Sequence, residues 1–357
     1  MLKLHSLYRT YGYARYKMDK FEEYELYLRH RDFLETDSII TFNDADGRLL
    51  ALKPDLTLSI VKNYRYTEGY VQKVFYSENV YRSLKPFRTH KEILQTGLEC
   101  LGDIGIPELS EVSMLAAASL AEVSDDFVLL ISHMGVIMDL LSGVEDEEIR
   151  QEMLRCAGEK NLHDLRRAAE AGGVPGALVE AVEALMEIRG PLEEVRERLG
   201  GLPLSWEGKK SLGELCQVAE ILGDAGYGGQ VQIDFSIVNN MKYYSGLLLR
   251  GYIKGLPKSV LSGGQYDRLM ASMDRRGGAL GFAVYLDELD SLSSGTDRLD
   301  ADCLLLYTEE DDPRAVAARA REIAAAGERV LVEKKAPDRL SAGRVERFGK
   351  NPEGGKR

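Results

Sequence analysis

The sequence predicts an α+β fold: one antiparallel sheet flanked by helices, with a helical insertion that divides its strands along the chain. Strand-like patterns occupy residues 39–102 and resume at 231–261. Between them, residues 145–225 are rich in Glu, Arg, Leu and Ala, and their apolar residues recur at helical spacing. Strands on both sides of a helical block favour a single sheet that is buried by packed helices.

The first group of strands begins with a predicted hairpin. Two apolar runs, at 39–42 and 49–52, flank the connector 43–47, whose Asn, Asp and Gly residues are typical of a turn. Two longer runs with β-branched and aromatic residues follow at 71–80 and 92–101. We expect these four runs to be strands.

Helices are predicted on both sides of the long strands and throughout the insertion. A short one is expected at 59–66, and a longer one at 107–123, which starts with proline and continues as an Ala-rich run. Glycine-containing pairs at 172–173, 190–191 and 200–201 divide the insertion into several short helices.

The remaining patterns complete the sheet and add a small C-terminal unit. Strands are predicted at 231–235, 243–253 and 260–261, followed by a helix near 280–292; a β-α-β unit then follows, with its strands at 302–307 and 329–333 and its helix at 312–326.

We therefore divide the chain into four parts. They are a discontinuous core (1–125 and 226–295), a mostly helical insertion (126–225), a partial α/β unit (300–340) and a polar, Gly-rich tail expected to lack fixed structure (341–357).

Composition is that of a soluble globular protein. Of the 357 residues, 44% are hydrophobic and 29% are charged. The net charge of −12 argues against a large nucleic-acid interface, because phosphate contacts need clustered Lys and Arg. The four cysteines are far apart, so neither a zinc site nor a disulfide framework is indicated. No signal peptide or membrane span is visible, and we expect a cytoplasmic protein without metal or cofactor.

Five short motifs occur in an order that resembles the histidyl-tRNA synthetase family of class II aminoacyl-tRNA synthetases, over residues 10–290. The motifs are Leu52-Lys53-Pro54-Asp55-Leu56-Thr57, Tyr81-Arg82 with Gln95 and Glu99, Tyr243-Tyr244-Ser245-Gly246, Ser262-Gly263-Gly264-Gln265-Tyr266-Asp267, and Gly281-Phe282-Ala283. Residues 11–13 and 21–27 also resemble the family's first motif, which implies a homodimer. The resemblance implies the class II synthetase-like sheet.

The resemblance also implies a pocket for a histidine-like amino acid. Its residues would be Asp55, Thr57 and Gln95 around the α-amino group, Glu99 and Tyr244 on the imidazole, and Gly264 where the backbone approaches the ligand. For the carboxylate, three alternatives stay open: Arg82 substitutes for the family's arginine, or histidine binds weakly, or it binds elsewhere in the assembly.

At three places in this predicted pocket, a purely structural role competes with ligand binding as the explanation of the residues. Glu99 alone would more often be a carboxylate on the surface of a sheet. In a strand, Tyr243 and Tyr244 would face opposite sides, so we expect only Tyr244 in the pocket. Gly263 and Gly264 fit a bulge, or a tight turn packed close to another strand, as well as they fit backbone approach to a small ligand.

The departures from the family remove positive charge. Glu288 stands where the family's last motif has an arginine that clamps triphosphate, and Asn239 stands where it has the arginine for the substrate carboxylate. Thr89 and Lys91 occupy positions where arginines are usual in the second motif. Because cationic groups stabilise a transferring phosphoryl group, we expect no adenylation and assign no catalytic residue.

A family with these properties is the regulatory subunit of ATP phosphoribosyltransferase, which resembles histidyl-tRNA synthetase and also has a shortened C-terminus. The resemblance implies a homodimeric core in a hetero-oligomer, a short catalytic phosphoribosyltransferase subunit as partner, and histidine as allosteric effector in histidine biosynthesis. Two alternatives stay open: a divergent histidine–tRNA ligase, and a dimeric synthetase-like interaction scaffold. The shortened C-terminus and the net charge of −12 argue against tRNA binding.

Overall fold

The computed structural model describes residues 1–34, 39–84, 89–237, 243–289, 299–337 and 339–349. The chain forms two compact units, Met1–Asp290 and Ser291–Arg357. Each unit has its own sheet and its own buried core. No helix in the described part of the chain is long and apolar enough to cross a membrane.

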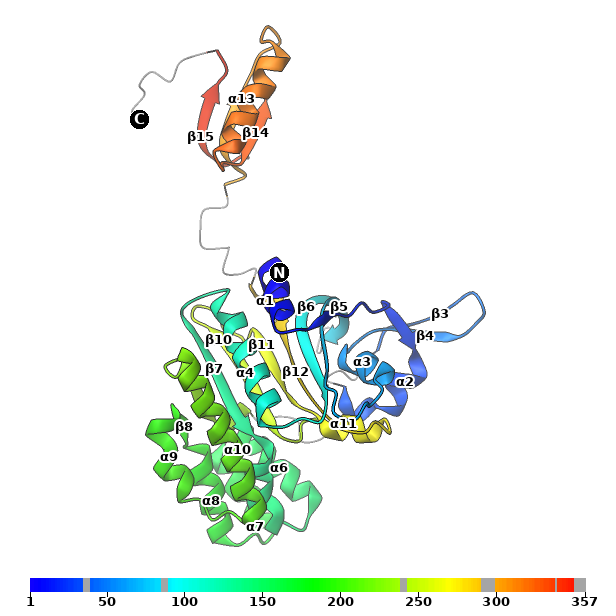
Figure 1. The fold of residues 1–357 in the computed structure, drawn as a ribbon, viewed down its shortest axis with the longest axis vertical. Helices are drawn as coiled ribbons and strands as arrows, with labels where there is room; N and C mark the ends of the chain where they lie inside the picture. The colour runs from blue at the N-terminus through cyan, green and yellow to red at the C-terminus, as the bar shows by residue number, and fades with distance from the viewer. Residues whose placement is uncertain (35–38, 85–88, 238–242, 290–298, 338, 350–357) are drawn as a thin grey trace. The chain divides into compact units, whose positions relative to one another are not determined.

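A mixed sheet forms the centre of the first unit (Figure 1). Its strands, in spatial order, are β1 (Ala14–Arg15), β5 (Gln72–Leu84), β6 (Thr89–Gly102), β12 (Gly278–Tyr285), β11 (Leu261–Gln265), β10 (Leu247–Ile253), β7 (Phe127–His133), β9 (Val231–Asp234) and β8 (Arg189–Gly190). The pairs β1–β5 and β7–β9 are parallel and the others antiparallel. The predicted antiparallel sheet is thus confirmed for its central strands and corrected at both ends.

Alternating side chains give this sheet two different faces. Phe75 and Leu98 are register partners, and both are fully buried in the core that includes residues of α4 (Ile106–Ala121). On the opposite face, Val74 and Tyr76 pack with residues of α3 (Thr57–Asn63). The helix α1 (Leu2–Thr10) contributes Leu4 and Tyr8 to the first of these cores.

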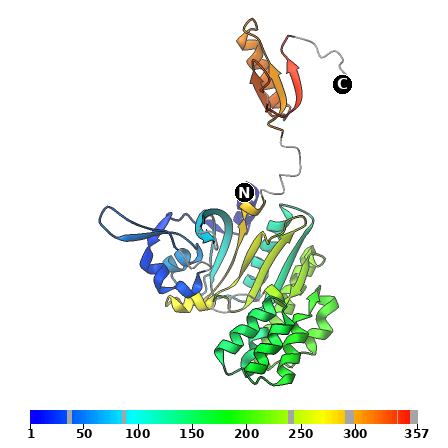
Figure 2. The same cartoon turned by 180° about the vertical axis from the view of Figure 1, so that it is seen from behind.

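A small three-stranded sheet lies beside α3. It consists of β2 (Phe21–Glu23), β4 (Leu49–Leu52) and β3 (Thr41–Asn43), and α2 (Tyr24–Arg29) follows β2 directly. The strands β3 and β4 form the predicted hairpin, which projects from one side of the unit (Figure 2). Its turn is held by Asp44, whose carboxylate accepts the backbone N–H groups of Asp46 and Arg48.

The insertion is helical after its first strand. Its helices are α5 (Met134–Leu140), α6 (Glu147–Gly158), α7 (Leu162–Ala171), α8 (Gly176–Met186), α9 (Leu192–Gly200) and α10 (Trp206–Leu222), gathered at one end of the sheet in both views. Side chains of Asp146, Asn161 and Ser205 cap α6, α7 and α10. The strand Phe127–His133 belongs to the main sheet, so the sheet extends past the boundary predicted at residue 126.

Two other segments differ from their predicted structure. The helix expected near 280–292 is strand β12 as far as Tyr285, followed only by the short α12 (Leu286–Leu289). A continuous apolar run does not distinguish a buried strand from a helix, which explains the error. The strand expected at 243–253 begins at Leu247, because residues 243–246 form a turn before it.

The second unit is a parallel β-α-β structure with one added strand. Its elements are β13 (Ala301–Leu306), α13 (Pro313–Ala325), β14 (Val330–Glu333) and β15 (Ala342–Arg347), with the strand order β14-β13-β15. Strand β15 lies where we predicted an unstructured tail. Its polar sequence hid it, since Glu346 is paired with Arg319 at 2.6 Å and Arg344 at 2.7 Å rather than packed in the core.

Candidate functional site

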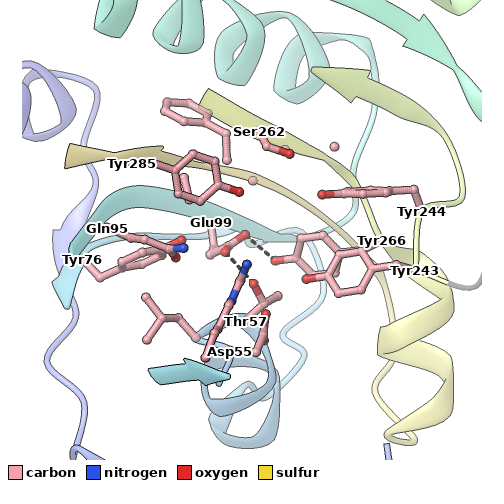
Figure 3. Close-up of a pocket in the computed structure, with 17 residues that line it drawn as sticks. Asp55, Thr57, Tyr76, Gln95, Glu99, Tyr243, Tyr244, Ser262, Tyr266 and Tyr285 are labelled. Carbon is pink, nitrogen blue, oxygen red and sulfur yellow. Dashed lines mark hydrogen bonds between the residues drawn. The ribbon is translucent and has the colours of Figure 1, made fainter. Parts of the chain in front are cut away.

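A pocket opens on the face of the main sheet that carries α3 (Figure 3). Its empty space, including the open solvent at its mouth, is about 500 Å³, and all seven residues predicted for the site line it. These are Asp55, Thr57, Arg82, Gln95, Glu99, Tyr244 and Gly264, joined by Leu56, Tyr76, Tyr243, Ser262, Gly263, Tyr266, Gly281, Phe282, Ala283 and Tyr285. The structure therefore brings the predicted residues together; their role in binding a ligand stays a prediction.

The floor of the pocket is a patch of small residues on three adjacent strands. Glu99 on β6 is the register partner of Gly281 on β12, which in turn pairs with Gly264 on β11. Two residues further along, Ala283 pairs with Ser262. Residues directly opposite each other point to the same face of an antiparallel sheet. On β11 and β12 these side chains are absent or short, so the sheet leaves a hollow here, and Glu99 and other larger residues surround it.

Gly281 leaves room for the Glu99 carboxyl group. A Cβ atom at position 281 would lie 1.8 Å from Oε2 of Glu99 and 2.4 Å from the backbone oxygen of Leu98. The glycine therefore positions Glu99, a role that the sequence did not suggest.

The two glycines of β11 have different surroundings. The register with β10 and β12 is unbroken across Gly263 and Gly264, so the predicted alternative of a bulge is wrong. A Cβ atom at Gly263 would lie 2.2 Å from the oxygen of Gly281, so tight strand packing explains this glycine. At Gly264 it would lie 2.6 Å from the backbone oxygen of Leu247 and 2.9 Å from the ring of Tyr244, so both the neighbouring strand and the pocket wall restrict this glycine.

Glu99 is the buried carboxyl group at the centre of the site. It is 2% exposed, so it is not the sheet-surface carboxylate that competed with the functional interpretation. Thr57 donates a hydrogen bond to its Oε1 at 3.1 Å, and Tyr266 donates one to its Oε2 at 2.6 Å (Figure 3). Burial raises the pKa of Glu99 most, the hydroxyl donors lower it and the nearby Asp55 raises it, so that the pKa moves from 4.5 to about 8.

This pKa predicts how Glu99 affects stability. The folded protein holds the proton more tightly than the unfolded chain, so the contribution of Glu99 is full below pH 4.5 and falls as the pH rises to about 8. The free energy of unfolding then falls by at most about 1.4 kcal/mol per pH unit. We expect urea unfolding between pH 5 and 9 to show that this free energy falls more in the wild type than in Glu99→Gln. Parallel pH profiles for the two proteins would contradict it.

Five of the described residues that line the pocket are tyrosines. Tyr243 and Tyr244 both line the pocket, with ring centroids 4.7 Å apart. The prediction that only Tyr244 would face it is wrong, because these residues lie in a turn and strand alternation does not apply. Tyr266 contacts Tyr243 with centroids 5.9 Å apart. Sequence reasoning missed Tyr76 and Tyr285, although both lie on strands at positions that alternate with core residues.

The polar residues near α3 are held by local contacts. The Asp55 carboxylate accepts the backbone N–H of Leu58 at 2.9 Å in the first turn of α3. Arg82 donates from Nε to the Pro54 oxygen at 3.3 Å. Gln95 is 4% exposed, and its Nε2 has no hydrogen-bond partner in the structure. A buried amide without a partner is costly, which favours a ligand oxygen at this position.

The acidic residues of the last motif are paired with lysines. Glu288 lies 3.2 Å from Lys258. Asp287 lies 3.8 Å from Lys91 and accepts the backbone N–H of Leu94 at 3.4 Å. Both lysines therefore already face carboxylates. Asn239, the other position where an arginine was expected, lies outside the described residues.

Metal chemistry has no visible basis in the described residues. They contain no group of three or more His, Cys, Asp or Glu side chains that could hold a metal ion. Hydrogen-bonding groups and aromatic rings are thus what this pocket offers, and such a combination fits a small polar molecule with a ring.

Comparison with known proteins identifies relatives of the whole fold. Residues 1–289 match the sequence model of a family described as histidyl-tRNA synthetase. An ATP phosphoribosyltransferase regulatory subunit from Oceanobacillus iheyensis is 25% identical over 313 residues, covering 85% of this chain and 76% of the relative.

Solved structures agree with this match. A Bacillus halodurans protein, described as an ATP phosphoribosyltransferase regulatory subunit/histidyl-tRNA synthetase, is 26% identical with a TM-score of 0.75, covering 97% of this chain and 92% of its own. A chain from the ATP phosphoribosyl transferase complex of Thermotoga maritima has the same fold, with a TM-score of 0.62 at 19% identity, covering 80% and 95%. The chain belongs to the histidyl-tRNA synthetase family, has its class II synthetase-like fold, and resembles the ATP phosphoribosyltransferase regulatory subunits.

Proposed function

We propose that this chain is a non-catalytic regulatory subunit that activates a short ATP phosphoribosyltransferase catalytic subunit and senses histidine in the first step of histidine biosynthesis. One observation carries the proposal: a pocket lined by all seven residues predicted for an amino-acid site lies beside a segment whose carboxylates, Asp287 and Glu288, are paired with lysines. The names of the relatives support it, since several are regulatory subunits of that enzyme.

Histidine fits the chemistry of the pocket. Its imidazole has two nitrogen atoms, and Glu99 with the tyrosine hydroxyls around it supplies both donors and acceptors. Asp55, Thr57 and the amide of Gln95 supply partners for the ammonium group, and Arg82 supplies a cation for the carboxylate. A site built to hydrogen-bond a polar side chain rejects apolar analogues strongly, because its buried groups would be left unpaired.

Activation of ATP does not fit the charges next to the pocket. A triphosphate needs cations where its negative charge develops. Glu288 places a carboxylate there, and its partner Lys258 is engaged at 3.2 Å. Lys91 likewise faces Asp287. Bringing a triphosphate here would require both ion pairs to separate, which supports a binding role without adenylation.

A homodimeric core belongs to the same proposal. Phe21 and Phe42 form an edge-to-face pair on the small sheet and are 46% and 39% exposed. Exposed aromatic clusters of this kind are typical of covered surfaces in assemblies. The proposed hetero-oligomer would then join such dimers to catalytic subunits and couple the histidine pocket to activity through two states with different affinities.

The decisive experiment is an activity assay of the short catalytic subunit from the same organism, with and without this chain, during titration with histidine. We expect activity to rise about 5- to 150-fold with the chain present, the range of usual coupling energies, and to fall as histidine is added. No activation would overturn the proposal. Activation without a histidine response would favour the scaffold, and histidine-dependent ATP–pyrophosphate exchange would favour the ligase.

A further inference from the structure

A second cavity adjoins the pocket and shares two wall residues with it. Its empty volume is about 770 Å³, and Ile93, Tyr252, Pro257, Lys258, Ser259 and Glu288 line it together with Arg82 and Tyr285. Arg82 and Tyr285 also line the first pocket. The two spaces are therefore neighbours, and these two side chains stand between them.

Tyr285 is fixed at this position by the sheet. It ends β12 and is the register partner of Gln95 on β6, so its side chain points to the pocket face. Its backbone N–H donates to the oxygen of Val260 at 2.8 Å. In Figure 3, the hydroxyl groups of Tyr285 and Tyr244 point toward each other from opposite sides of the pocket, with Glu99 between and below them.

Along the pocket face of β12, Tyr285 is the first large side chain after two small residues. Positions 281 and 283 are Gly and Ala, which leave the floor open, and position 285 closes it. On the far side, the ion pair of Lys258 and Glu288 lies in the wall of the second cavity. A ligand that extended from the first pocket into the second cavity would have to pass Arg82 and the Tyr285 ring, the two side chains that line both spaces.

We propose that the Tyr285 side chain is the partition that closes the pocket at the carboxylate end of the bound amino acid and so limits the ligand to a free amino acid. The inference rests on the proposed histidine site, in which Arg82 takes the carboxylate. Arg82 lies in both walls, so the carboxylate end faces the second cavity. Tyr285 thus determines specificity by size and is not itself needed to hold the imidazole.

The test is calorimetric binding of L-histidine and of L-histidylglycine, which is extended at the carboxylate end, to the full-length protein. We compare the wild type with Tyr285→Ala and Tyr285→Leu, which remove the far part of the ring, and with Tyr285→Phe, which keeps it. We expect the wild type and Tyr285→Phe to bind histidine at least about tenfold more tightly than the dipeptide, and both truncations to reduce that ratio by about tenfold.

The outcomes separate this inference from the function on which it rests. Histidine binding in all four proteins with an unchanged ratio would overturn the role of Tyr285 alone. If the ratio of the affinities for histidine and the dipeptide changed as much in Tyr285→Phe as in Tyr285→Ala, the role of the ring would also be overturned. The hydroxyl group, and not the bulk of the ring, would then determine the specificity. Failure of the wild type to bind histidine would overturn the histidine site and the partition together. Thermal melts of each variant confirm that the folded proteins are compared.

Discussion

The Glu99→Gln variant is expected to lose most of its affinity for histidine while it still activates the catalytic subunit. The substitution keeps the shape of the side chain but removes the carboxyl group that accepts from Thr57 and Tyr266. A buried hydrogen-bonding group that is left without its partner costs about 1–3 kcal/mol, which corresponds to a loss of roughly 5- to 150-fold in affinity. Calorimetry and the histidine concentration for half-inhibition of the complex both measure it.

A matched control lies on the same strand. Glu92, seven residues before Glu99 on β6, bonds Tyr81 at 3.0 Å and does not line the pocket. Glu92→Gln should therefore respond to histidine as the wild type does. If Glu99→Gln and Glu92→Gln were inhibited at the same histidine concentration, histidine would act at another site of the assembly.

Gly281→Ala is expected to lower the free energy of unfolding of the protein. The new Cβ would overlap Oε2 of Glu99 and the backbone oxygen of Leu98, and a backbone atom of a central strand cannot move away at low cost. Overpacking of this kind typically destabilises by about 1–3 kcal/mol. Urea unfolding should show the midpoint shifted to lower denaturant with an unchanged slope.

A glycine-to-alanine substitution in a helix is expected to stabilise the protein instead. Gly213 lies inside α10, and nothing is within 4 Å of the position that its Cβ would take. Gly213→Ala should raise the free energy of unfolding by about 0.4–1 kcal/mol, since alanine loses less conformational entropy in a helix. Equal stability of Gly281→Ala and the wild type would show that the floor of the pocket tolerates added volume.

The sequence predicted which residues lie together in one pocket better than it predicted the elements around them. Asp55, Thr57, Gln95 and Glu99 were identified because they match short family motifs, and such a match does not depend on where each strand begins or ends. Tyr285 was missed because it follows an apolar run, where an aromatic residue is indistinguishable from core.

Long-range pairing explains the other differences. The run that became β12 has an apolar sequence that suits a helix or a strand, and only its neighbours β6 and β11 decide between them. Strand β15 is polar, so no local pattern indicated it; the parallel register with β13 and the ion pairs of Glu346 place it. Local patterns in a single sequence do not show which distant segments pair with each other.

The small-residue floor has a consequence for the lifetime of the protein. Its parts come from three strands, and the hydrogen bond between Glu99 and Tyr266 joins positions 167 residues apart. No fragment of the unfolded chain can bind the ligand, so occupancy stabilises only the completed sheet, by about 2.7 kcal/mol at a ligand concentration 100 times Kd. A filled pocket therefore also slows proteolysis that proceeds through unfolding, and links the ligand supply to how long each molecule survives.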